Sequence, residues 1–236
     1  MKLRGGINGG TLATMLAISE RPERRKALAD PYLLNPPEQR DGVFPAPDRR
    51  SVSFDEDRKV WLAPFFMAPI NTRVVRRSAA LFAAYEEPYG DGFHYEEALE
   101  TSRRLKAHAV TATTGGMFTL ARTAWGRAAL AKLGPAPGQG TSERTMDRGF
   151  FRLRLVGTSA SGRKLLATIA RSGDPGNRVT VPILCEAALH LATSARDSLP
   201  GGAARGGVLT PATALGLPLL ERLRQAEFQA SVTPLS

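Results

Sequence analysis

The clearest alternation of apolar and polar residues lies between Phe150 and Gly157, where apolar side chains at every second position are separated by arginines. This is the period of a strand with one buried face. A turn at Ser159 to Gly162 leads into a second apolar segment, Lys164 to Arg171. The pattern predicts a β-hairpin with charge on one face.

Helical spacing predicts two helices after this hairpin. The first extends from about Arg178 to Ala195, and the second from Pro211, a favoured first-turn residue, to Gln225. A short strand is expected at the end of Gly201 to Thr210, and a terminal strand from Phe228 to Val232. The core-facing stripe predicted for the first helix consists of Val181, Leu184, Cys185, Ala188, Leu189 and Ala192.

The beginning of the chain predicts a short strand, a glycine-rich turn at Gly5 to Gly10, and a helix that ends before Pro22. Five prolines between Asp30 and Arg50, Pro45 among them, predict an extended surface loop, because proline fixes φ and cannot donate a backbone hydrogen bond.

Lys59 to Met67 has the pattern of a buried strand, and Asn71-Thr72 after it has the chemistry of a helix N-cap. A short strand is expected at Asp91 to Tyr95. The alanine-rich stretch from Tyr95 to Leu133 predicts one or two helices with a break near Gly115-Gly116. The elements together predict an α/β chain of the α+β kind, with a mixed β-sheet and flanking helices.

The composition is that of a globular protein, with 236 residues, 42% hydrophobic and 23% charged. Such a length allows one large domain or two small ones. The longest apolar run, Val60 to Ile70, contains two prolines and is too short for a transmembrane helix. The glycines from Gly5 to Gly10 interrupt any secretory signal pattern. We therefore expect a cytoplasmic protein.

The net charge of +10 raises nucleic acid or an anionic membrane as a partner. Only six of the 32 basic residues are lysine, and no basic strand is interleaved with aromatic residues, which argues against nucleic acid. The arginine-rich helices between Arg103 and Arg127 keep an alternative open, namely a non-catalytic interaction module at the periphery of a membrane. A single cysteine, Cys185, and three scattered histidines predict neither a disulfide nor a metal site.

The glycine cluster is the first candidate binding site. Its spacing is not the G-x-G-x-x-G of a dinucleotide site, so no cofactor-binding residue is assigned here. A helix start can nevertheless offer backbone N–H groups to a carboxylate or phosphate, which makes Gly9, Gly10 and Thr11 candidate substrate-binding residues. The alternative is a tightly packed turn.

The second candidate is the helix start at Asn71 and Arg73. Arg73 could project toward an anionic ligand or be an ordinary surface arginine, and Asn71 could only cap the helix. His94, with Glu96 and Glu97 nearby, could act in acid–base chemistry, but a lone histidine on a short strand more often has a structural role. No residue is assigned as catalytic.

The sequence resembles the saccharopine dehydrogenase-like oxidoreductases, in particular the group that includes trans-acting enoyl reductases. The resemblance occurs in order over nearly the whole chain, in the segments Arg4–Ala13, Pro64–Ser78, Tyr89–Glu97, Arg148–Arg154, Gly173–Gly176, Glu186–Leu189 and Gly206–Ala212. Members of this family begin with a Rossmann domain, which has no counterpart in these 236 residues.

The resemblance implies the second domain of a two-domain NAD(P)-dependent oxidoreductase, one that supplies the substrate side for hydride transfer to an enoyl substrate. It places Gly9, Gly10 and Thr11 at the cleft. NAD(P) is not expected to bind this chain alone, and the implied partners are a Rossmann domain that is encoded separately or lost, and a second copy in a homodimer. The implied division of the chain is 1–30 as the junction with the nucleotide domain, 31–58 as a proline-rich loop, 59–200 as the substrate and dimerisation domain, and 201–236 as a strand-helix-strand returning toward the nucleotide domain.

Overall fold

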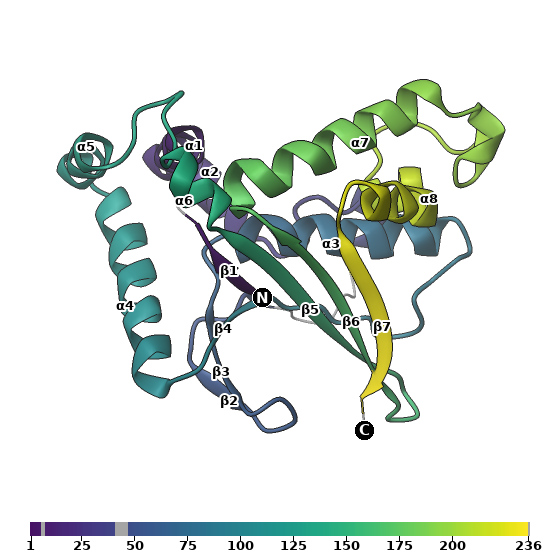
Figure 1. Cartoon of the computed structure of the whole chain (residues 1–236), viewed down its shortest axis with the longest axis horizontal. Helices are drawn as coiled ribbons and strands as arrows, with labels where there is room; N and C mark the ends of the chain where they lie inside the picture. The colour runs from purple at the N-terminus through teal and green to yellow at the C-terminus, as the bar shows by residue number, and fades with distance from the viewer. Residues whose placement is uncertain (6–7, 41–46, 236) are drawn as a thin grey trace. The chain divides into compact units, whose positions relative to one another are not determined.

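The computed structural model describes residues 1–5, 8–40 and 47–235 (Figure 1). The chain divides into two compact units. The terminal unit consists of Met1–Ile7 and Gly140–Ser236, and the central unit of Asn8–Gln139. Residues of the predicted segment 59–200 therefore occur in both units.

A four-stranded antiparallel sheet forms one layer of the terminal unit. The predicted hairpin is its centre, with Leu153 opposite Ile169 and a turn in which the Ser159 N–H donates to the Arg163 carbonyl at 2.9 Å. The hairpin prediction is confirmed, and so is a strand at the end of the chain. The strand order is β1 (Lys2–Arg4), β5 (Phe150–Thr158), β6 (Lys164–Ser172) and β7 (Gln229–Leu235).

Helices and turns complete the terminal unit: α6 (Glu143–Asp147), η2 (Pro175–Val179), α7 (Thr180–Thr193), η3 (Arg196–Ser198), η4 (Gly202–Ala204) and α8 (Pro211–Gln225). The core cluster takes Leu215, Leu219 and Leu223 from α8, together with Val179 and Phe228. The last helix begins at Pro211 as predicted, since Thr210 and Thr213 form a reciprocal capping box at its start. No strand forms between Gly201 and Thr210, where the described backbone is irregular apart from η4.

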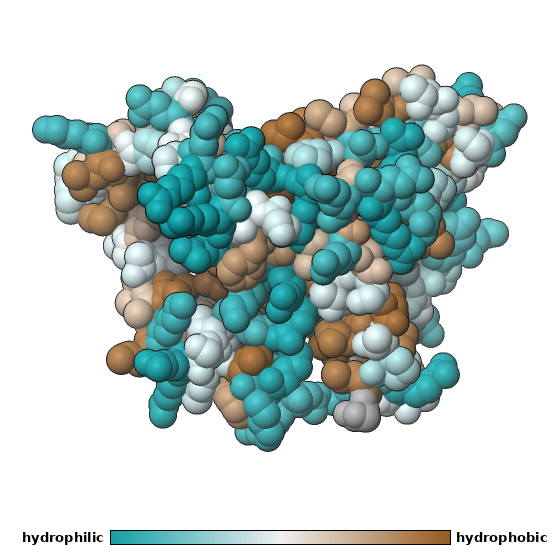
Figure 2. Space-filling view, in the orientation of Figure 1, coloured by the Kyte–Doolittle hydropathy of each residue, from teal (hydrophilic) through white to brown (hydrophobic). Residues whose placement is uncertain are grey.

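The predicted core-facing stripe of α7 is wrong. Leu184 on that stripe is 67% exposed, whereas Ile183 and Ala187 pack against the core cluster. Apolar residues occupy both sides of this helix, so their spacing could not select the buried side. The space-filling view shows hydrophobic residues along the outer side of α7 (Figure 2).

The central unit combines helices with a three-stranded sheet. Its strands β2 (Ser53–Asp55), β3 (Val60–Pro64) and β4 (Ala98–Thr101) pair in the order β2-β3-β4, and both pairings are antiparallel. The helices are α1 (Gly9–Glu20), α2 (Pro22–Ala29), η1 (Pro37–Gln39), α3 (Ala68–Ala84), α4 (Arg104–Ala121) and α5 (Ala124–Leu133).

Several predicted boundaries in the central unit are wrong. Helix α3 begins at Ala68, with a proline in its first turn, so Asn71 lies inside the helix and does not cap it. Gly115-Gly116 lies within α4, and the break comes at Thr123, whose side chain caps α5 by accepting from the Gly126 N–H. The strand expected at Asp91 to Tyr95 is absent from the described backbone there, and the nearby strand is β4.

The α+β class is confirmed. Its strands form two sheets, and every pairing among the described residues is antiparallel, so the structure differs from the expected single mixed sheet. No helix within the described ranges is both long and apolar enough to cross a membrane. The described part of the chain also brings together no group of three or more His, Cys, Asp or Glu side chains that could hold a metal ion.

Candidate functional site

An apolar cavity of about 470 Å³ lies within the central unit. Its apolar lining comes from α1, α2, the segment Pro64–Ile70 that joins β3 to α3, and α4. This segment supplies Phe65, Phe66 and Met67, while α4 contributes Phe118 and, at Gly115, a position without a side chain. The size and the lining are those of a site for a small molecule with a hydrophobic part.

The charged side chains that line this cavity are mostly cationic. Arg25, Arg49, Arg50 and Arg122 all contribute to its lining, and Arg50 and Arg122 are exposed. The described lining has one acidic side chain, Asp48, and its carboxylate pairs with another arginine. Arg49 forms an ion pair with Glu96, which leaves Arg25, Arg50 and Arg122 to give the cavity a positive potential that favours a ligand with an anionic group.

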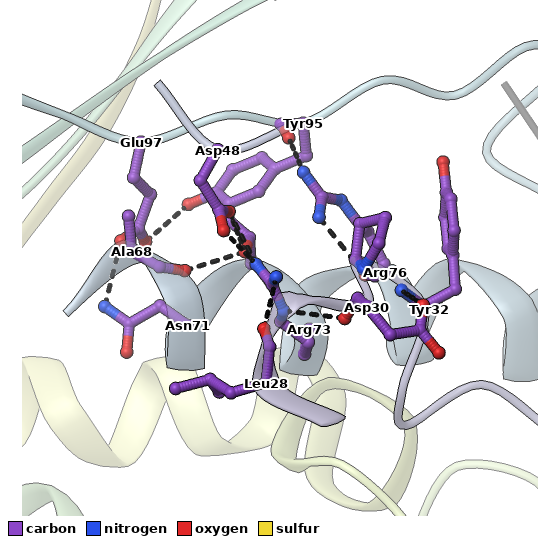
Figure 3. Close-up of polar contacts among 12 residues, drawn as sticks. Leu28, Asp30, Tyr32, Asp48, Ala68, Asn71, Arg73, Arg76, Tyr95 and Glu97 are labelled. Atoms are coloured by element: carbon purple, nitrogen blue, oxygen red, sulfur yellow. Dashed lines mark hydrogen bonds and ion pairs between the residues drawn. The ribbon is translucent and has the colours of Figure 1, made fainter. Parts of the chain in front are cut away.

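The partner of Asp48 is Arg73 on α3, whose side chain is only 2% exposed (Figure 3). One terminal nitrogen of Arg73 donates to both carboxylate oxygens of Asp48, at 2.5 and 2.6 Å. The remaining nitrogens donate to the carbonyl oxygens of Leu28 at 2.8 Å and Asp30 at 3.1 Å. The guanidinium is therefore engaged within the central unit, and it fixes Leu28 and Asp48, which both line the cavity.

Two further arginines of α3 hold the backbone that follows α2. Arg76 donates to the Pro31 carbonyl at 3.2 Å and to the Tyr95 carbonyl at 3.0 Å. Arg77 donates to the Leu34 carbonyl. The predicted proline-rich loop is thus tied to α3 over its first residues, while Pro45 lies outside the described residues.

Asn71 belongs to a half-buried network around the Glu97 carboxylate (Figure 3). Its amide nitrogen donates to one oxygen of Glu97 at 2.9 Å, and the Tyr95 hydroxyl donates to the other at 2.9 Å. Burial raises the pKa of Glu97, although both hydrogen bonds act in the opposite direction. Burial, reinforced by the Glu97 charge, also raises the pKa of Tyr95. Neither Glu97 nor Tyr95 is part of the described lining of the cavity.

The glycine turn has a structural explanation. A Cβ on Gly9 would lie 1.8 Å from the Ala136 carbonyl oxygen, and the Gly9 N–H donates to the Gln139 carbonyl at 2.8 Å. The N–H and hydroxyl of Thr11 both donate to the Asn8 side chain, at 2.9 and 2.7 Å. A Cβ on Gly10 would meet only the Asn8 side-chain oxygen, at 3.8 Å. These contacts use the Gly9 and Thr11 N–H groups that a ligand at the helix start would need.

None of the five predicted substrate-binding residues belongs to the described lining of the cavity. Arg73 acts on this cavity only through Leu28 and Asp48, which it holds. Sequence reasoning missed Gly115 and Phe118, because α4 has a weak apolar period and its glycines were interpreted as a break. The apolar run before α3 could have indicated the cavity, but its pattern predicts only a strand.

Comparison with known proteins finds relatives that align with nearly the whole chain. One relative is a protein of Mycobacterium tuberculosis that is provisionally named a trans-acting enoyl reductase. Its alignment with this chain has 249 positions and is 38% identical, and it covers 99% of this chain and 58% of that protein. The chain resembles trans-acting enoyl reductases. Proteins with that name from Mycobacterium ulcerans and Mycobacterium bovis are each 35% identical, over 97% and 98% of this chain and 56% and 57% of their own lengths.

The similarity covers both units, and the chain spans somewhat more than half the length of these relatives. No protein-family model matches the sequence, and no solved structure is significantly similar to it.

Proposed function

We propose that this chain is the substrate-binding part of an oxidoreductase that reduces the carbon–carbon double bond of an enoyl substrate. The names of its relatives support the reaction class. The observation that carries the proposal for this chain is the apolar cavity with arginines around it. An enoyl thioester has an apolar acyl chain, which matches the apolar lining of the cavity. It is commonly carried on a phosphate-bearing group, which matches the arginines.

The apolar lining supplies the binding energy in this proposal. Each methylene group transferred from water into an apolar site contributes about 0.8 kcal/mol, so a medium-length acyl chain gains substantial affinity from the walls formed by Phe65, Phe66 and Phe118. Arg50 and Arg122, being exposed, would interact with the anionic carrier. The chain thus binds and orients the enoyl group, while reaction requires a hydride donor.

The resemblance to saccharopine dehydrogenase-like oxidoreductases implies that NAD(P) is that donor. The described residues do not fit a Rossmann dinucleotide site, because their strands pair only in antiparallel fashion and the Gly9 and Thr11 N–H groups at the first helix start are already bonded within the chain. We therefore propose that a Rossmann domain, separate from these residues, holds the nicotinamide cofactor. The isolated chain is expected to show no saturable NADPH binding in a calorimetric titration.

Calorimetric titration of the chain with trans-2-dodecenoyl-CoA tests the cavity assignment. Gly115→Leu places a side chain in the cavity and should weaken binding by roughly tenfold, equivalent to about 1.4 kcal/mol. Gly116→Leu is the matched control, because it lies on the same helix outside the described lining, and neither substitution meets an atom within 4 Å of its Cβ. Equal affinities of the two variants, or absence of binding to the unmodified chain, would refute the assignment.

A second candidate function rests on exposed residues of α4 and α5. Trp125 is 67% exposed at the start of α5, and Leu105 is also exposed beside Arg104 at the start of α4. Exposed apolar residues beside cations are typical of proteins that bind anionic membrane surfaces. Co-sedimentation with phosphatidylserine vesicles that decreases with salt and with Trp125→Ser would favour this candidate. Binding to the enoyl thioester without vesicle binding favours the oxidoreductase.

A further inference from the structure

A second cavity in the central unit, of about 260 Å³, is lined by residues of α3 and of the loops on either side of it. Its aromatic side is a row of rings. The rings of Phe82 and Tyr89 have centroids 5.1 Å apart, and Tyr89 and Phe93 are separated by the same distance. Tyr89 and Phe93 line the cavity and are exposed, so the aromatic side is accessible from solvent.

The same lining contains a buried cation. Arg76 is 4% exposed, and two of its nitrogens donate to backbone carbonyls, while Nε has no hydrogen-bond partner. Among the described residues, no carboxylate forms an ion pair with Arg76. The acidic group that acts on it electrostatically is Asp48, which is already bound by Arg73. Burial lowers the pKa of Arg76, which shows the cost of keeping this charge away from water.

A buried amide lies beside this cation in the same lining. Asn35 is 5% exposed, its Nδ2 donates to the Gln39 carbonyl at 3.5 Å, and its Oδ1 has no partner. A buried acceptor without a donor costs about 1–3 kcal/mol. The cavity therefore brings together a buried arginine without an ion-pair partner among the described residues, an unused acceptor and an aromatic wall.

We propose that this second cavity binds a small aromatic carboxylate. The carboxylate compensates the charge of Arg76, the ring stacks against Tyr89 and Phe93, and a hydrogen-bond donor on the ring satisfies Asn35. A cavity of about 260 Å³ accommodates one substituted ring rather than a dinucleotide. This site is separate from the proposed acyl cavity, since the described linings of the two have no residue in common.

The test is calorimetric titration of the whole chain with 3-aminobenzoate, and with 3-aminobenzamide as the neutral analogue. We expect saturable binding of the carboxylate and affinity at least about tenfold weaker for the amide, a difference of about 1.4 kcal/mol. Ala83→Leu fills the cavity and should weaken 3-aminobenzoate binding by a similar factor. Ala84→Leu is the control, because the neighbouring Ala84 is equally exposed and lies outside the described lining.

Three results would overturn the proposal: no saturable binding of 3-aminobenzoate, equal affinity for the amide, or equal loss in the two alanine variants. Both substitutions place leucine at exposed helix positions, so the melting temperatures should stay close to that of the unmodified chain. Binding of trans-2-dodecenoyl-CoA should be the same in Ala83→Leu as in Ala84→Leu. This measurement separates failure of the second cavity from failure of the proposed enoyl-binding function.

Discussion

Both units bury apolar side chains, but the buried arginines among the described residues lie in the central unit. The core cluster of the terminal unit is apolar, with Val179, three leucines of α8 and Phe228. The central unit buries Arg73 and Arg76 in addition to apolar residues such as Leu62 and Phe65, and both cavities described above are lined by its residues. Packing alone accounts for an apolar cluster, whereas a buried guanidinium has a desolvation cost that must be offset by a partner. The buried arginines therefore add to the two cavities as grounds for placing binding in the central unit.

The largest expected loss of stability tests whether the buried Arg73 side chain stabilises the central unit. Arg73→Met leaves the Asp48 carboxylate without its charged partner and releases the carbonyls of Leu28 and Asp30, so we expect a loss of about 3–5 kcal/mol of unfolding free energy. Arg50→Met replaces an exposed arginine and should change the unfolding free energy by less than about 0.5 kcal/mol. Urea denaturation measures both. Similar losses for the two variants would mean that the Arg73 pair has no special role.

The terminal unit should respond to loss of apolar volume. Leu215 is among the most buried side chains of the core cluster, and Leu215→Ala should cost about 2–5 kcal/mol through lost transfer energy and a residual cavity. Leu217, just past the kink at Gly216 in α8, is exposed, and Leu217→Ala should cost less than about 0.5 kcal/mol. Differential scanning calorimetry of both variants makes the comparison. A small effect at Leu215 would contradict the idea that this cluster holds the unit together.

A smaller loss of stability distinguishes the two interpretations of the glycine turn, a packed turn and a ligand site. Gly9→Ala forces a Cβ against the Ala136 carbonyl and should cost about 1–3 kcal/mol. Gly10→Ala meets no close atom and should be neutral or stabilise the chain by about 0.5 kcal/mol. Thermal unfolding measures both. If Gly10→Ala leaves stability unchanged but abolishes binding of the enoyl thioester, the glycine turn is a ligand site after all.

The parts of the fold that sequence reasoning predicted are those with strong local signals. The hairpin follows from strict alternation, and α8 follows from Pro211 and its capping threonines. The buried side of α7 depends on tertiary packing, because its sequence is apolar on both sides. The start of α3 was placed too late, since Asn71 is a good capping residue but its side chain bonds to Glu97, 26 residues away in sequence.

The candidate site was harder to predict than the fold. Its cavity is formed by side chains from α1, α2, α4 and the segment before α3, and no spacing within one segment shows that these meet. Arg73 was selected for its charge, but its function in the structure is to hold Asp48 and two carbonyls. The residue type predicts a positive charge near the start of α3, whereas its partners, Asp48 and two backbone carbonyls, are known only from the structure.

The smallest expected effect is a pH dependence at Glu97. Because burial raises its pKa above the ordinary value of 4.5, the folded state favours the protonated form. The stability this provides is complete below the unfolded pKa and is lost as the pH rises through the folded pKa. Relative to Glu97→Gln, which keeps the shape, the melting temperature of the unmodified chain should fall as the pH rises above about 4.5. A difference that stays constant above this pH would show that Glu97 is not perturbed.

Hydrogen exchange with and without trans-2-dodecenoyl-CoA tests the central claim most directly, because it locates binding without any substitution. The account predicts slower exchange in α4, near residues 111–122, and in the segment around residues 64–70, with α8 unchanged. Protection confined to α8 in the terminal unit, or no protection at a saturating ligand concentration, would contradict the claim that the central unit binds the enoyl chain.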